Sequence, residues 1–156
     1  MGRIGKTIIW GTSWFALSAA GALAQEYTLR VHSFGSAASM DHTAHLDRWA
    51  ETVMAQSDGR IAVEVYPSLR LGGGVADLMA QLDDGIVDIV WTLPGFTPGR
   101  FPRTQGLELP FMNTGTSTTM SPAAMEFIEG YLQPEFEGIK ITSVHATDAA
   151  IMHTRD

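Results

Sequence analysis

The sequence has no cysteine and few basic residues. Without cysteine, no disulfide can stabilise the fold, but this does not identify the compartment, because exported and cytosolic proteins can both lack thiols. The chain has 10 lysine and arginine residues against 17 acidic ones, giving a formal net charge of −7. Nucleic-acid binding depends largely on basic residues that neutralise phosphates. The composition therefore argues against a nucleic-acid partner.

Several motifs of catalysis and phosphate binding are also missing. There is no G-x-G-x-x-G, and the glycines at 72–74 are not followed by a Lys-Ser/Thr pair, so they predict a flexible turn. The segment that begins at Gly115 lacks the last glycine of a G-x-S-x-G elbow. His42 and His45 lie beside Asp41, but with no third ligand a solvated helix start is favoured over a metal site. No metal and no cofactor are expected.

The first 24 residues have the pattern of a secretory signal peptide. Arg3 and Lys6 form a basic region, residues 8–20 are apolar and uncharged, and residues 22–24 form a small-residue cleavage pattern. An uncleaved membrane anchor is the alternative, but the small and polar residues within the run argue against it. Cleavage would remove two basic residues and change the formal charge from −7 to −9. We therefore expect an exported protein that is not inserted in the membrane after cleavage.

Strand-like and helix-like segments alternate in the first half of the remaining chain. Alternating apolar residues predict strands over 26–34 and 61–66, and an apolar run interrupted only by Asp88 predicts a strand over 86–91 that is covered on both faces. Apolar residues at i, i+3, i+4 and i+7 predict helices around 46–54 and 75–82. Strands that alternate with helices favour a parallel sheet, so the predicted fold class is α/β.

The second half of the chain predicts one more helix and one more strand. Ser121 and Pro122 are suitable as the N-cap and first residue of a helix whose apolar stripe extends to Leu132. Residues 139–144 predict a further strand. The last residues show no terminating signal, so the chain is expected to be truncated, with residues 25–156 forming one α/β lobe.

The loop after the third predicted strand is the predicted binding site. Prolines and glycines follow Trp91 closely and turn the backbone over the end of the sheet, where ligands bind in open parallel sheets. Trp91 and Phe96 flank this turn and are the first candidates for packing against a ligand. Phe101 and Phe111 are expected in the core instead.

Three motifs in order resemble the N-terminal half of the solute-binding proteins of tripartite ATP-independent periplasmic (TRAP) transporters. They are LGGG at 71–74, GIVDI at 85–89 and LELPF at 107–111. The resemblance implies a periplasmic-binding-protein-like lobe, with a mostly parallel sheet flanked by helices, that is the first of two lobes. It implies capture of a small organic acid, delivery to the membrane permease subunits, and no catalysis. It also implies a longer chain, because the second lobe and an arginine that pairs with the ligand carboxylate would lie beyond Asp156.

By position in this motif order, the lobe contributes three loops to the ligand site. The candidate ligand-binding residues are Phe34, Ser36, Trp91, Thr92, Phe96, His145 and Asp148. The type of acid stays open among dicarboxylates, sugar acids, 2-oxo acids and aromatic acids.

Two alternative functions also stay open. One is an exported α/β enzyme that uses Asp88 or His145 as an acid or base, and the other is a fragment with no function of its own. Asp88 interrupts an apolar run, where a carboxylate is costly unless it is hydrogen-bonded. A structural role, in which it accepts backbone N–H groups, is favoured over a catalytic one.

Overall fold

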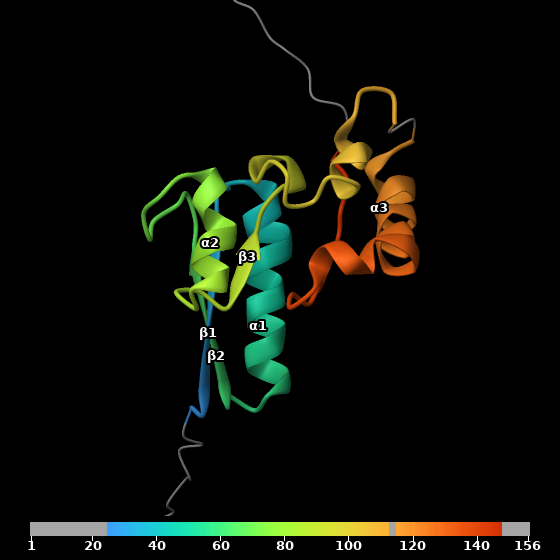
Figure 1. The fold of residues 1–156 in the computed structure, drawn as a ribbon. Coiled ribbons are helices and arrows are strands. Elements are labelled where there is room, and N and C mark those ends of the chain that lie inside the picture. The colour runs from blue at the N-terminus through green and yellow to red at the C-terminus, as the bar shows by residue number, and fades with distance from the viewer. Residues whose placement is uncertain (1–24, 113–114, 148–156) are drawn as a thin grey trace, which may run out of the picture.

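The computed structural model of the protein describes residues 25–112 and 115–147 (Figure 1). The predicted signal peptide and Asp148 lie outside the described residues. A sheet with two helices forms one part of the molecule, and a smaller helical part lies beside it. The strands and α-helices of the described residues are β1 (Tyr27–Ser33), α1 (Asp47–Gln56), β2 (Ile61–Tyr66), α2 (Leu78–Asp83), β3 (Ile89–Trp91) and α3 (Ser117–Phe127), and short 3₁₀- and π-helical segments lie between and after them.

The three strands form a parallel sheet in the order β2-β1-β3. β1 is the central strand, and its residues 27–32 pair with residues 61–66 of β2. At its carboxyl end, residues 31–33 pair with residues 89–91 of β3. Each connection between consecutive strands contains a helix, α1 or α2. The predicted α/β lobe with a parallel sheet flanked by helices is therefore confirmed.

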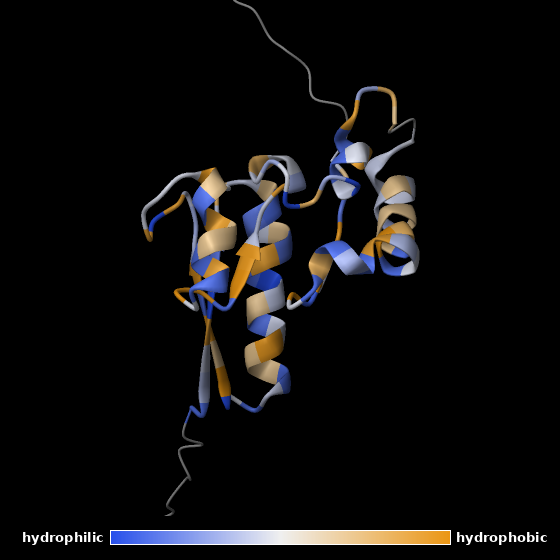
Figure 2. Ribbon diagram, in the orientation of Figure 1, coloured by the Kyte–Doolittle hydropathy of each residue, from blue (hydrophilic) through white to orange (hydrophobic). Residues whose placement is uncertain are grey.

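The carboxyl-terminal half of β1 is the most buried part of the sheet. Val31, His32 and Ser33 have no exposed surface. α1 packs against β2 with Ala50 buried, and α2 packs against β3 with Leu78 fully buried. Figure 2 shows that β3 is apolar and that apolar and polar residues alternate around α1, as expected for an amphipathic helix.

β3 is shorter than the apolar run that predicts it. The N–H groups of Ile86 and Val87 donate to the carbonyl of Gln81, at 2.9 and 3.4 Å, and so close the end of α2 instead of joining the sheet. Gly85 has a φ of +68°, which confirms its predicted place at the end of this helix. Because Ile86 is 46% exposed, the prediction that the whole run is covered on both faces is wrong.

The last helix begins four residues before its predicted N-cap. α3 starts at Ser117, and the N–H of Thr116 donates to Thr119 Oγ1 at 3.1 Å in a capping arrangement. Pro122 therefore lies inside the helix, where it removes one backbone hydrogen bond. Ser121, the predicted N-cap, donates its hydroxyl to the carbonyl of Ser117 at 2.6 Å instead.

No strand forms at residues 139–144, so the prediction of a further strand is wrong for the described part of the chain. A strand requires a neighbour to complete its hydrogen-bond ladder. Among the described residues, the sheet ends at β2 on one side and at β3 on the other, and neither reaches this segment. Residues 138–147 instead line the cleft between the two parts of the molecule.

The loop after β3 is tied to the segment after α3. Phe101 is 3% exposed and stacks on Phe136 with a centroid separation of 4.8 Å, which confirms its predicted place in the core. Glu135 accepts hydrogen bonds from the N–H groups of Arg103 (2.7 Å) and Thr104 (3.0 Å) and from the Thr104 hydroxyl (2.7 Å). Desolvation opposes its charge, but these hydrogen bonds outweigh it and hold the pKa of Glu135 below its ordinary value.

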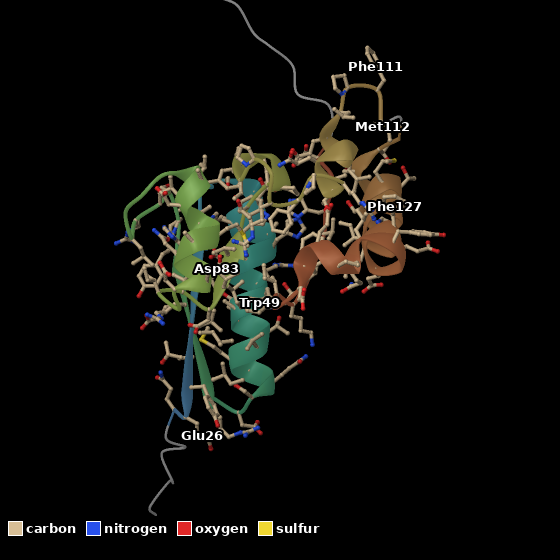
Figure 3. All side chains as sticks on the ribbon, viewed as in Figure 1. Glu26, Trp49, Asp83, Phe111, Met112 and Phe127 are labelled. Atoms are coloured by element: carbon tan, nitrogen blue, oxygen red, sulfur yellow. The ribbon has the colours of Figure 1, made fainter. Side chains whose placement is uncertain are left out.

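Phe111 is the clearest exception to the predicted core. Its side chain is 94% exposed and its φ is +68°, a left-handed conformation that is uncommon for a bulky residue. Phe111 and Met112 lie in a loop far from the sheet (Figure 3). The prediction that Phe111 is a core residue is therefore wrong.

In the part of the chain that the structure describes, no helix is long and apolar enough to cross a membrane.

Candidate functional site

A broad cleft of about 1750 Å³ separates the sheet part from the helical part. Trp91, Thr92 and Phe34 line it from the carboxyl ends of the strands, and Phe127 lines it from α3. The position agrees with the rule that ligands bind beyond the carboxyl ends of parallel strands. The cleft is larger than the 300–1,000 Å³ that small-molecule sites usually occupy, so a small ligand would fill only a part of it.

Four rings stack in a column, which we call the ring column; the first three line this cleft, and the fourth lines a smaller cavity. They are Phe34, Trp91, His145 and His45, with successive centroid separations of 5.0, 5.5 and 6.1 Å and interplanar angles of 18°, 30° and 13°. Phe96 contacts Phe34 edge-on, at 5.1 Å and 87°. The structure thus brings together four of the predicted site residues, Phe34, Trp91, Phe96 and His145.

The close approach of β1 and β3 explains where Trp91 lies. Ser33 pairs with Trp91 in the sheet, and the chain then turns at Gly35 directly beside the indole. A Cβ atom at Gly35 would lie 2.6 Å from Trp91 Cζ3 and 3.2 Å from His42 Cδ2. Glycine is therefore required at position 35 for this packing.

His42 is buried and supports Trp91 edge-on. Its ring is 1% exposed, hydrogen-bonds through Nε2 to Ser33 Oγ, and meets Trp91 edge-on at a centroid separation of 6.1 Å. The expectation of a solvated helix start is therefore wrong at His42, although His45 is exposed as expected. The spacing of the two histidines indicated a shared helix face, but no sequence signal showed that Ser33 would bind the first of them.

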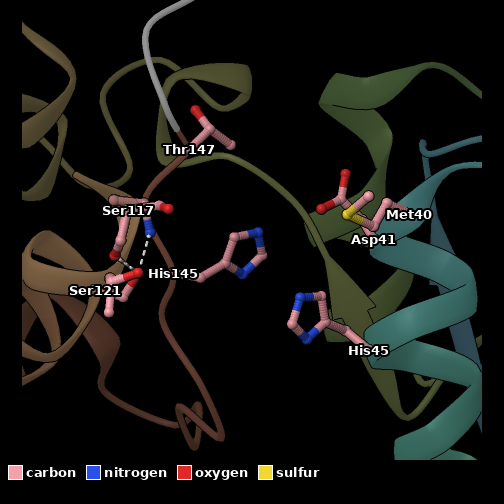
Figure 4. Close-up of a pocket in the computed structure, with 9 residues that line it drawn as sticks. Met40, Asp41, His45, Ser117, Ser121, His145 and Thr147 are labelled. Carbon is pink, nitrogen blue, oxygen red and sulfur yellow. Dashed lines mark hydrogen bonds between the residues drawn. The ribbon is translucent and has the colours of Figure 1, made fainter.

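His145 is held by α3. The Ser121 hydroxyl oxygen accepts the N–H of Ala146 at 2.9 Å, next to the His145 ring (Figure 4). In the same view His145 and His45 face each other across a smaller cavity of about 390 Å³, which Asp41 and Thr147 also line. Ser121 is therefore a positioning residue that the sequence marked only as a helix start.

Thr92 places an unpartnered hydroxyl in the wall of the cleft. Its Oγ1 atom is buried and has no hydrogen-bond partner among the described residues, although the residue lines the cleft. A buried hydroxyl without a partner is costly, and a polar group of a ligand would remove that cost.

Two other predicted site residues are not placed at the ring column. The Ser36 hydroxyl accepts the N–H of Ala38 at 3.3 Å and stabilises the turn after β1, and the residue does not line the cleft. Asp148 lies outside the described residues. Roles for Ser36 and Asp148 in ligand binding stay predictions.

Asp88 has the structural role that the sequence favoured. Its carboxylate accepts the N–H of Arg30 at 2.8 Å and lies 3.5 Å from the guanidinium of the same residue. The carboxylate is partly exposed, because β3 begins only after Asp88. It connects β1 to the start of β3.

The charges around the cleft do not provide a strong anion site. Asp41, Asp83, Asp88 and Glu108 line it, and Lys140 is the one lysine or arginine among its described lining residues. Asp83 is neutralised in part by Arg100, whose hydrogen bonds lower the pKa of the carboxyl group. No group of three or more His, Asp or Glu residues in the described ranges could hold a metal ion. The described wall of the cleft therefore offers rings more than positive charge.

Comparison with known families agrees with this arrangement. The model of the bacterial extracellular solute-binding proteins, family 7 (DctP), matches residues 31–154. The chain belongs to this family. Members of family 7 are binding proteins rather than enzymes, and the sheet and flanking helices described above have the fold of their lobes.

Several relatives of this family 7 chain are characterised or have solved structures. It is 34% identical over 94 residues to the ectoine/5-hydroxyectoine-binding periplasmic protein UehA of Ruegeria pomeroyi, an alignment that covers 60% of the chain and 26% of the relative. A marine metagenome TRAP solute-binding protein specific for aromatic acids, solved with 3-hydroxybenzoate, is 38% identical with a TM-score of 0.73, covering 78% of the chain and 38% of that structure. A TRAP solute-binding protein from Rhodoferax ferrireducens, solved with copurified benzoate, is 40% identical with a TM-score of 0.70, covering 76% and 36%. The chain thus spans about a quarter of its curated relative and less than two fifths of these structures.

Proposed function

We propose that this family 7 chain forms the first lobe of a periplasmic protein that captures a small organic acid and delivers it to the membrane permease of a TRAP transporter. The observation that carries the proposal is the cleft beyond the carboxyl ends of β1 and β3, which is lined by three rings of the ring column and by Thr92 with its unpartnered hydroxyl. Benzoate and 3-hydroxybenzoate, bound by two of its relatives, are both carboxylates. Residues 1–24 serve as the signal peptide that exports it.

The proposed residues divide into those that contact the ligand and those that shape the loops. Trp91, Phe34 and His145 offer ring surface, and Thr92 offers a hydroxyl. Ser36 and Asp148 are proposed at the ligand through the position of their loops. Since none of the described lining residues is an arginine, the main positive charge for the carboxylate would come from outside this lobe.

A thermal-shift screen tests the proposal. The chain from Gln25, extended to any second lobe encoded beyond Asp156, is melted with a panel of small organic acids and, as matched controls, with the amides of the same acids, which keep the shape and lose the charge. A ligand present at a thousand times its Kd stabilises the native state by about 4 kcal/mol. We expect a rise of the midpoint with one class of acid and not with its amides.

Two results would contradict the proposal. A cooperative unfolding transition that no acid shifts would refute capture of an organic acid. The lack of any cooperative transition would favour a fragment without function of its own. Turnover of an added acid that is lost in Asp88→Asn would instead support the exported-enzyme alternative.

A further inference from the structure

We infer that the ligand is a planar aromatic acid whose ring stacks on the face of Trp91 that the His145 ring covers in this structure. This inference rests on the proposed function and narrows it to one chemical class. Of the four classes of acid that the sequence left open, only aromatic acids have a flat ring that can stack on Trp91.

The ring column is assembled from segments far apart in the sequence. Phe34 follows β1, Trp91 ends β3, His45 precedes α1, and His145 follows α3. Interplanar angles of 13° to 30° along the column mean that every ring presents its face to the next. Stacked aromatic rings gain about 0.5–1.5 kcal/mol beyond the area they bury, so this arrangement selects flat partners.

The two ends of the column are held differently. Phe34 and Trp91 are half-buried, Phe96 supports Phe34 edge-on, and His42 supports Trp91 edge-on. The contacts of Trp91 with Phe34 and His42 fix the plane of the indole. Trp91 therefore is a preformed stacking surface.

His145, in contrast, is an exposed ring on a segment without regular secondary structure. The Ser121 to Ala146 hydrogen bond holds its neighbour, while the ring itself stacks on Trp91 and on His45. A side chain rotation would free the Trp91 face and leave a slot as thick as one flat ring. A planar ring fits that slot, whereas a puckered ring of the same carbon number is thicker.

Thr92 adds a polar requirement in the same cleft. Its buried hydroxyl directly follows Trp91 in the chain and has no partner within residues 25–112 or 115–147. A hydroxyl or carboxylate substituent on an aromatic ring can satisfy it, and an unsubstituted hydrocarbon cannot. The surface is thus matched to a flat apolar body with a polar edge.

Binding of three probe acids to the full chain tests the inference. Benzoate is flat, cyclohexanecarboxylate has the same carbon skeleton but is puckered, and succinate has no ring. Saturation-transfer NMR titration is suitable because it measures weak binding. We expect benzoate to bind about 2- to 12-fold more tightly than cyclohexanecarboxylate, the range that stacking provides, and succinate to bind more weakly than both.

Two tryptophan variants show whether Trp91 is the surface. Trp91→Leu should abolish the preference for benzoate over cyclohexanecarboxylate. Trp49→Leu, in a half-buried tryptophan of α1 outside the ring column, should keep it. If Trp91→Leu does not fold, the relative affinities of the unchanged protein for the three acids still test whether it prefers a flat ring.

The possible failures are distinguishable. Equal binding of benzoate and cyclohexanecarboxylate, or preferred binding of succinate, would overturn the inference and leave the proposed capture of an organic acid intact. A Trp91→Leu variant that folds and keeps the preference would also overturn it. Binding of none of the three acids, nor of any acid in the thermal-shift panel, would overturn the proposed function and the inference together.

Discussion

A single methyl group at Gly35 should destabilise the protein through Trp91. In Gly35→Ala the new Cβ would lie 2.6 Å from Trp91 Cζ3, whereas ordinary van der Waals contact begins at 3.4 Å. The two atoms must therefore separate by about 0.8 Å. Cζ3 belongs to a rigid indole that stacks on Phe34 and His145, so the strain cannot be relieved by rotating a flexible chain end.

The expected cost follows from this geometry. Overpacking a closely packed site by one methyl group costs about 1–3 kcal/mol. Gly130→Ala is the matched control, because a Cβ there meets no atom within 4 Å and the backbone φ of Gly130 is not positive. That control should be neutral or stabilise by about 0.4–1 kcal/mol, since alanine restricts the unfolded chain.

Denaturant unfolding of Gly35→Ala and Gly130→Ala measures the free energy of unfolding. A background with Phe at positions 10, 14 and 49 makes Trp91 the only tryptophan, so its emission reports the displacement of the indole. We expect Gly35→Ala to lower the free energy of unfolding and to shift the emission. Equal free energies for the two variants with unchanged Trp91 emission would refute the packing described for Gly35.

Three further outcomes follow from the described contacts. Leu78→Ala should lower the free energy of unfolding by about 2–5 kcal/mol, because Leu78 is fully buried, whereas Leu109→Ala, 59% exposed, should change it by less than about 0.5 kcal/mol in the same denaturant series. The folded-state pKa of Glu135 lies below its ordinary value of 4.5, so its contribution to stability is present above pH 4.5 and is lost as the pH falls through the lower, folded-state pKa. Glu135→Gln should therefore flatten the acid limb of a curve of unfolding free energy against pH. An unchanged acid limb would contradict this expectation. Ser121→Ala should speed hydrogen exchange at the N–H of Ala146, which loses its acceptor, and an unaltered exchange rate would show that the contact does not form.

The sequence predicts the sheet well because its signals are local. Alternating and continuous apolar runs mark β1, β2 and β3, and the helical stripes mark α1 and α2. One error, in the start of β3, arises because backbone N–H groups could bond either to the sheet or to the end of the preceding helix. Ile86 and Val87 have strand-forming side chains, but their N–H groups bond to the end of α2, so β3 begins three residues late.

The other errors arise from partners that periodicity cannot show. Residues 139–144 have the apolar alternation of a strand, yet no strand lies beside them among the described residues. Ser121 followed by proline resembles a helix start, but Thr116 provides a cap one turn earlier. Phe111 is apolar enough for a core, but its position in an exposed loop depends on the surroundings of that loop rather than on its own sequence.

The ring column shows why a binding site is harder to predict than a strand. Sequence reasoning proposed Trp91 because it ends a predicted strand, and the parallel sheet brings strand ends to one edge. It proposed Phe34 and His145 from the resemblance to the TRAP solute-binding proteins. It did not find that His45 would complete the stack or that Gly35 would let the indole approach, because both depend on contacts between distant segments. The order of strands along the sequence thus predicts which loops lie near one another. The orientation of the rings and the packing at Gly35 determine the shape of ligand that fits between those loops. For this lobe the second step is the informative one, since the inference of a flat ligand rests on the stacking of the four rings.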